Sequence, residues 1–160
     1  MVAAIALWWS LVVFGNITDY GTNFAFVQHV MSMDTLFPTT TITYRAISNP
    51  AFHHAVYIAI IATQIVATLL CWLGTLALLR AYRGSAKAFN SAKGFAIAGL
   101  TLGFLLYDVV FMSIAGEWFG MWMSQQWNAT PSAFHFLMIM IAVLIFLAIP
   151  DLDIDETEVE

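Results

Sequence analysis

The chain has 160 residues, of which 61% are hydrophobic and only 9% are charged. A globule of this length has too much surface for its volume to hide so much apolar material, so an ordinary soluble domain is excluded and part of the solvent is lipid. The formal net charge of −5 belongs to one end, because six of the ten acidic residues fall in positions 151–160. No basic patch is left for nucleic acid, and the single cysteine, Cys71, excludes an internal disulfide and a cysteine-pair metal motif.

Four segments are long and apolar enough to cross a bilayer, which takes about 20 mainly apolar residues. With their polar ends, the predicted helices cover about residues 2–31, 50–83, 87–115 and 131–149. The first is interpreted as a retained helix and not a secretory signal, because no Lys or Arg precedes Arg45. The sequence therefore predicts an all-α polytopic membrane protein, with a single four-helix transmembrane domain over residues 1–150, short extramembrane loops and an acidic tail over residues 151–160.

The loop charges predict the orientation in the membrane. Arg80, Arg83, Lys87 and Lys93 lie in the connection between the second and third helices, whereas the other two connections hold only Arg45. Since positively charged loops stay in the cytoplasm, both termini are expected there, in a multi-pass protein of an inner membrane. The acidic tail then shares a face with the basic connection, and it either contacts that connection or remains loosely solvated.

Polar residues gather in the half of the helices away from this basic connection. Asn16, Asp19, Tyr20 and Asn23 follow the spacing i, i+3, i+4, i+7, which places them on one face of a continuous helix. At about 1.5 Å per residue, counting from the helix ends places Asp108 and His135 at a similar depth. The predicted buried polar cluster is Asn16, Asp19, Tyr20, Asn23, Tyr107, Asp108 and His135. It is either a hydrogen-bonded network that fixes helix register or a functional site.

A second group of polar residues is expected just outside the membrane on the same side. These candidate ligands are His29, Asp34, His53, His54 and Glu117. For a copper or zinc ion, the candidates are His29, His53, His135 and Glu117, and paired histidines on facing helices would be needed for a haem. The spacing lacks HExxH, His-x-His and cysteine pairs, so satisfied histidines without a cofactor are the simpler interpretation.

The third helix carries Gly99 and Gly103 in a GxxxG pattern. Small residues allow helices to approach closely in lipid, so this pattern indicates either packing inside the bundle or a seam against a second copy or another subunit.

Four stretches carry a family resemblance: residues 16–34 (NITDYGTNFAFVQHVMSMD), 49–54 (NPAFHH), 88–94 (AFNSAKG) and 116–128 (GEWFGMWMSQQWN). They resemble the uncharacterised bacterial family of "predicted small integral membrane proteins", a domain of unknown function. The similarity extends over nearly the whole chain. It implies a bacterial inner-membrane helical bundle and no particular activity. Members of that family begin with a longer basic stretch, which leaves open a natural start upstream of Met1.

Two functions are compatible with these observations. The first is a non-enzymatic subunit or assembly partner of a larger membrane complex, because the chain is small and has no recognised catalytic spacing. The alternative is a metal, haem or quinone site that faces the periplasm. Lipid is the expected surrounding in both, with other membrane subunits or a second copy as the expected protein partners.

Overall fold

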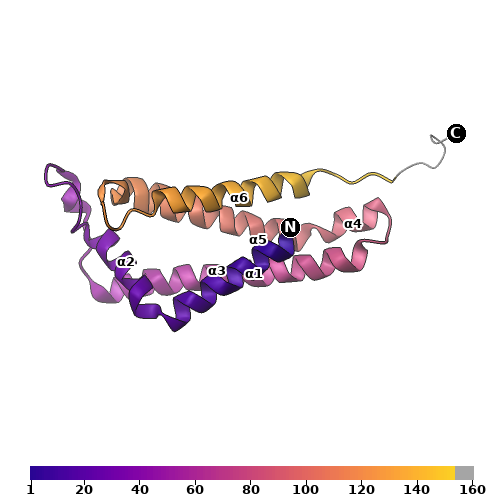
Figure 1. The fold of residues 1–160 in the computed structure, drawn as a ribbon, viewed down its shortest axis with the longest axis horizontal. Coiled ribbons are helices and arrows are strands. Elements are labelled where there is room, and N and C mark those ends of the chain that lie inside the picture. Colours follow the sequence, from indigo (N-terminus) through magenta and orange to yellow (C-terminus); the bar gives the residue numbers. More distant parts are fainter. Residues whose placement is uncertain (154–160) are drawn as a thin grey trace.

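The computed structural model describes residues 1–153, and these residues form helices joined by short connections (Figure 1). The elements are the α-helices α1 (Val2–Thr18), α2 (Tyr20–Ser32), α3 (Pro50–Ala81), α4 (Ala86–Ala92), α5 (Gly94–Leu105) and α6 (Thr130–Ala148), the 3-10 helices η1 (Ile42–Arg45) and η3 (Met121–Met123), and the π-helix η2 (Leu106–Trp118). Three helices are long and apolar enough to cross a membrane, Pro50–Ala81, Ala86–Trp118 and Thr130–Ala148, and α1 with α2 makes a fourth if this bent pair is one span. The predicted helical membrane bundle is confirmed.

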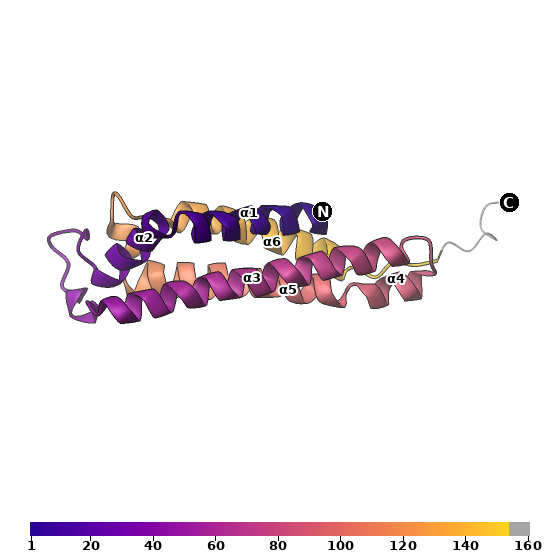
Figure 2. The same ribbon diagram turned by 90° about the horizontal axis from the view of Figure 1, so that it is seen from below.

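The long helices run alongside one another, and the connections gather at the two ends of the bundle (Figures 1 and 2). We call residues 33–49 and 119–129 the cap, because together they form one end. The α3–α4 connection and the described C-terminal residues lie at the opposite end, which we call the basic end. The π-helix η2 and the junction of α1 with α2 lie in the half of the bundle nearest the cap.

The expected single helix over residues 2–31 is interrupted at Asp19, where α1 and α2 meet at 89°. Asp19 has non-helical φ and ψ of −117° and 50°. Side chains support the backbone here, since the Tyr57 hydroxyl donates to the Asn16 carbonyl at 3.2 Å. The Asp19 carbonyl accepts from the Asn23 side-chain amide at 3.2 Å as well as from the Asn23 backbone N–H at 3.4 Å. Asn, Asp and Thr side chains compete for backbone groups, and a nearby glycine weakens a helix further, which accounts for a break in the sequence Asn16-Ile-Thr-Asp-Tyr-Gly21.

Small residues bring α3 and α5 together near the basic end. A Cβ atom on Gly74 would lie 2.5 Å from the Ala96 nitrogen, and one on Gly99 would lie 2.8 Å from the Cys71 sulfur. One on Gly103 would lie 3.1 Å from the Trp9 ring. Both glycines of the GxxxG pattern therefore contact neighbours within the chain.

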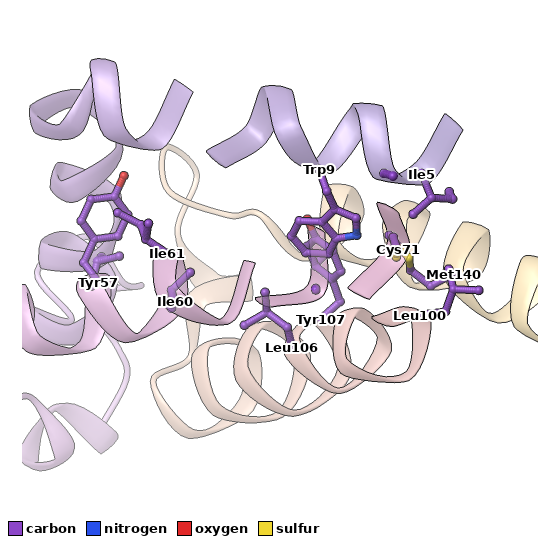
Figure 3. Packing of buried hydrophobic residues seen from close by; sticks show 14 of the residues in the cluster. Ile5, Trp9, Tyr57, Ile60, Ile61, Cys71, Leu100, Leu106, Tyr107 and Met140 are labelled. Atoms are coloured by element: carbon purple, nitrogen blue, oxygen red, sulfur yellow. The ribbon is translucent and has the colours of Figure 1, made fainter. Parts of the chain in front are cut away.

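Trp9 lies at the centre of the bundle, completely buried (Figure 3). Its ring lies 5.7 Å from that of Tyr107, and Leu100, Cys71 and Met140 are buried around the same region. The Trp9 indole N–H has no hydrogen-bond partner among the described residues. The core is therefore an aromatic and aliphatic contact between α1, α3, α5 and α6.

Helix caps follow the sequence in part. Asn49 caps α3, as the Asn-Pro pair predicts, by accepting hydrogen bonds from the Ala51 and Phe52 amides. The Thr130-Pro131 pair predicts a cap by Thr130 in the same way, but Thr130 is the first residue of α6, and the Asn128 side chain accepts from the Thr130 amide at 3.0 Å instead.

The described part of the acidic tail contacts the basic end. The Lys93 ammonium lies 2.6 Å from an Asp151 carboxylate oxygen and donates to the Ile149 carbonyl at 2.6 Å. The Asp153 carboxylate accepts from the Ala86 amide at 2.7 Å. The remaining acids of the tail, Asp155, Glu156, Glu158 and Glu160, lie outside the described residues.

Candidate functional site: an apolar groove beside a smaller chamber

The bundle is splayed near the cap, where α5 continues as the π-helix η2. The helices α3 and α5 pack closely together, whereas α3 makes few contacts with η2. A π-helix is rare and usually limited to one turn, and it often marks a functional site. Here it extends over 13 residues. Since α2 turns across the bundle at Asp19, its apolar residues face the space between α3 and η2.

This space is an apolar groove with a volume of about 570 Å³. The groove is lined from α2, α3, η2 and the cap by Phe26, Val27, Val30, Met31, Ile47, Phe52, Val56, Ala59, Ile60, Thr63, Leu106, Val110, Phe111, Ile114, Ala115, Trp118 and Phe119. None of these side chains is ionisable. The Thr63 hydroxyl is already engaged, because it donates to the Ala59 carbonyl at 2.9 Å. The lining can therefore hold hydrocarbon but offers almost no hydrogen bonds.

The groove is long in the direction of the helices. On α3 its lining runs from Phe52 near the cap to Thr63, eleven residues further along. At 1.5 Å per residue this is about 16 Å. One leaflet contributes about half of the roughly 30 Å hydrocarbon core of a bilayer. The groove thus has the length of one leaflet.

Arg45 lies beside the cap end of this groove. It donates to the Trp118 carbonyl at 3.2 Å, and its guanidinium carbon lies 4.7 Å from the centre of the Trp118 ring. It also donates from Nε to the Tyr44 hydroxyl at 3.3 Å. Trp118 is itself part of the groove lining. A positive charge is therefore held at the mouth of an otherwise apolar groove.

A smaller chamber of about 260 Å³, lined by both apolar and polar side chains, adjoins the groove. Its polar lining residues are Asn16, Asn23, Tyr57, Gln64, Tyr107 and Ser132. The Asn16 amide donates to the Gln64 side-chain oxygen at 2.7 Å, which links α1 to α3. Phe26, Val27, Ile60 and Phe111 line both spaces, so the wall between groove and chamber is one layer of side chains.

The predicted buried polar cluster is brought together only in part. Three of its members line the chamber: Asn16, Asn23 and Tyr107. Asp19 is exposed at the bend, and the Tyr20 hydroxyl instead lies 2.8 Å from His54 Nδ1.

The two deeper ionisable members also lie outside the chamber. Asp108 is half-buried, with no side-chain hydrogen bond among the described residues, and His135 is exposed. Asn16 and Asn23, on either side of the bend, both line the chamber, whereas Asp19 and Tyr20 at the bend do not, and Asp108 lies within the π-helix η2. Helical spacing therefore predicted only part of the chamber lining.

Sequence reasoning missed three chamber residues, Tyr57, Gln64 and Ser132. A signal for two of them was present, because Tyr57 and Gln64 are seven residues apart and so share a face of α3. Gln64 is also a polar residue in the middle of an apolar span, and it is 3% exposed. An uncharged amide in such a position is a marker of interhelical hydrogen bonding.

The candidate ligands predicted just outside the membrane do not gather at one site, because they contact different neighbours. His29 Nδ1 donates to the Asp34 carboxylate at 2.8 Å, while its ring stacks on Trp127 at 4.5 Å. His53 is buried and donates from Nε2 to the Ile47 carbonyl at 2.6 Å.

The other two candidate ligands are exposed. His54 stacks on Phe24 at 4.0 Å, and Glu117 lies at the surface. Within residues 1–153 there is no group of three or more His, Cys, Asp or Glu side chains that could hold a metal ion. A site for copper or zinc built from His29, His53, His135 and Glu117 therefore has no support in this geometry.

The comparisons with known proteins agree with the fold. The family model described as "Predicted small integral membrane protein (DUF2165)" matches residues 1–150. No curated protein and no solved structure matches this chain. Because the family match covers nearly the whole chain, and the structure has three or four helices suited to a bilayer, this protein belongs to the family of predicted small integral membrane proteins.

Proposed function

We propose that this protein is a non-enzymatic membrane component whose groove binds one hydrocarbon chain of a membrane lipid. The observation that carries the proposal is the lining of the groove, which is apolar along its whole length and as long as one leaflet. A volume of about 570 Å³ also falls in the range of ligand pockets, about 300–1,000 Å³. No acid, base or nucleophile lines the groove, so binding and not chemical conversion is the role that fits it.

The proposed location is a bacterial inner membrane, with both termini in the cytoplasm. Four basic residues, Arg80, Arg83, Lys87 and Lys93, lie at the basic end, against Arg45 alone at the cap. By the positive-inside rule the cap then faces the periplasm, provided that α1 with α2 crosses as one span. The groove would open to the outer leaflet.

Replacing Ala59 by tryptophan tests the proposal by filling the groove. Ala59 lines the groove and is exposed, so a large side chain there obstructs the groove without entering the core. We expect Ala59→Trp to reduce the fraction of purified protein that carries a bound lipid at least fivefold, as measured by native mass spectrometry. Ala142→Trp is the matched control, because Ala142 is exposed on α6 and lines neither groove nor chamber.

Equal lipid retention by the unmodified protein, Ala59→Trp and Ala142→Trp would contradict the proposal. The measured mass also identifies the chain type. We expect the mass of an acyl lipid. The mass of an isoprenoid quinone would instead identify the groove as a quinone site, which is one of the alternatives compatible with the sequence.

A role as accessory or assembly subunit is the second candidate, and the aromatic surface of the cap favours it. Phe37, Tyr44 and Trp122 are large and exposed there, with Tyr44 77% exposed, and Trp118 at the end of η2 is exposed beside them. Aromatic residues are enriched both at partner interfaces and in the belt at the membrane surface. Copurification from native membranes in mild detergent separates these roles, since a partner should be retained by the unmodified protein and lost from Tyr44→Ser with Trp122→Ser.

A further inference from the structure

Arg45 contacts two aromatic residues beside the mouth of the groove. Its side chain is half-buried, it donates to the Trp118 carbonyl and the Tyr44 hydroxyl, and it lies over the rings of both aromatic residues, at 4.7 and 5.4 Å. The guanidinium has five N–H donors, and these two contacts use two of them.

The charge of Arg45 is not balanced by an ion pair in the described part of the chain. The ion pairs between side chains in residues 1–153 are His29 with Asp34 and Lys93 with Asp151. Glu117 is adjacent to Trp118 in sequence, yet its carboxylate does not lie within 4.0 Å of Arg45. Guanidinium groups match the geometry of phosphate oxygens and bind them with two parallel hydrogen bonds.

The charge of Arg45 and the apolar groove together are complementary to an amphiphilic ligand, which has a charged head and an apolar chain. Arg45 lies at the cap end, and from there the apolar lining continues for about 16 Å along α3. A lipid whose phosphate reached Arg45 would place its acyl chain along this lining, parallel to the chains of its own leaflet. We propose that Arg45 binds the headgroup of an anionic phospholipid whose acyl chain occupies the groove. This inference rests on the function proposed above and names its ligand class.

Selectivity between headgroups follows from the net charge. Phosphatidylglycerol carries a net negative charge, whereas the choline group of phosphatidylcholine cancels the charge of its phosphate. One basic residue near a membrane surface favours an anionic lipid by a factor of about five. Glu117 opposes this preference by like-charge repulsion, so Glu117→Gln should increase it.

The experiment is a competition between two lipids with identical chains. Delipidated full-length protein is incubated with equimolar phosphatidylglycerol and phosphatidylcholine, and the bound ratio is measured by native mass spectrometry. We expect a ratio of about five for the unmodified protein, close to one for Arg45→Gln, and an intermediate value for Arg45→Lys. Ala59→Trp should lose both lipids, and Ala142→Trp should behave like the unmodified protein.

The outcomes separate the two proposals. If Arg45→Gln keeps the full preference for phosphatidylglycerol while Ala59→Trp loses both lipids, the headgroup inference is wrong and the groove proposal stands. If Ala59→Trp retains both lipids at the ordinary ratio, both proposals are wrong. Inorganic phosphate at millimolar concentration should not displace the bound lipid, and displacement would indicate a site for free phosphate instead of an amphiphile.

Discussion

Replacing Gly74 by alanine should separate the two helices that form the tightest contact in the bundle. The added Cβ would lie 2.5 Å from the Ala96 backbone nitrogen, 2.6 Å from its Cα and 2.7 Å from its Cβ. Because two of these three atoms belong to the backbone, no rotamer change relieves the overlap. The helices α3 and α5 must move apart along the contact that also buries Cys71 and Gly99.

The expected magnitude combines two opposing effects. Overpacking a well-packed core costs about 1–3 kcal/mol, and a backbone clash belongs at the upper end of that range. Alanine in a helix interior gains back up to about 1 kcal/mol relative to glycine. The free energy of unfolding should therefore fall by about 2 kcal/mol, which is roughly a thirtyfold change in the unfolding equilibrium.

The single cysteine supplies the assay. Cys71 is fully buried at the same helix contact, so a membrane-permeant maleimide reaches its thiol only when this contact opens. The rate of labelling in mild detergent then reports the population of the open form, and Gly74→Ala should increase it about thirtyfold. The control is Gly15→Ala, because a Cβ on Gly15 in α1 meets no atom within 4 Å; its labelling should stay constant or slow.

A double variant tests whether the clash involves the backbone of α5. In Gly74→Ala combined with Ala96→Gly, the Cβ of residue 96 is gone but its backbone nitrogen and Cα remain. We therefore expect Cys71 in the double variant to be labelled nearly as fast as in Gly74→Ala alone. Full recovery in the double variant, or unchanged labelling in Gly74→Ala alone, would show that the backbones do not approach as closely as described.

Three further changes test other parts of the structure, each by denaturant unfolding in micelles. Asn16→Leu and Gln64→Leu, alone and together, should give a coupling energy of about 0.6–1.7 kcal/mol, as interhelical hydrogen bonds in membranes do; additive effects would exclude a direct bond. Gly120→Ala should destabilise the protein by about 1–2 kcal/mol, because Gly120 has a φ of +65°, and no change would refute that conformation. Lys93→Met should cost about 1.5–3 kcal/mol by removing a charged hydrogen-bond donor from the Ile149 carbonyl and from Asp151, and high salt should lower the difference.

Sequence reasoning gave the class of fold because hydrophobic length alone decides it. A stretch of about 20 apolar residues has few alternatives to a membrane helix, and the Asn49-Pro50 pair marks a helix start by a local hydrogen bond. These features depend only on residues close together in the chain. The same holds for the GxxxG pattern, which indicates a close approach but not its partner.

The polar cluster could not be placed from the sequence because two irregularities lie within it. Counting by helical periodicity assumes an unbroken α-helix, and both the bend at Asp19 and the π-helix from Leu106 violate that assumption. Each rotates the residues that follow it. Asp108, which lies within the π-helix, does not line the chamber, while Gln64, on the regular helix α3, does. His135 lies on the regular helix α6, and helical spacing fixes faces only within one helix, so the sequence could not show whether His135 reaches the chamber.

The same two irregularities explain why a groove exists at all. Four straight helices with small residues along every contact would pack closely over their whole length and leave no space between α3 and the following helix. Gly74 and Gly99 permit this packing near the basic end, whereas larger side chains such as Val56, Ile60 and Val110 occupy the corresponding positions near the cap. The distance between α3 and η2 therefore increases towards the cap. The helix α2, turned through 89°, covers the space between them without filling it. Straightening the bend would remove Val27 and Val30 from the groove, so chain binding should depend on the conformation at Asp19 as much as on the lining itself.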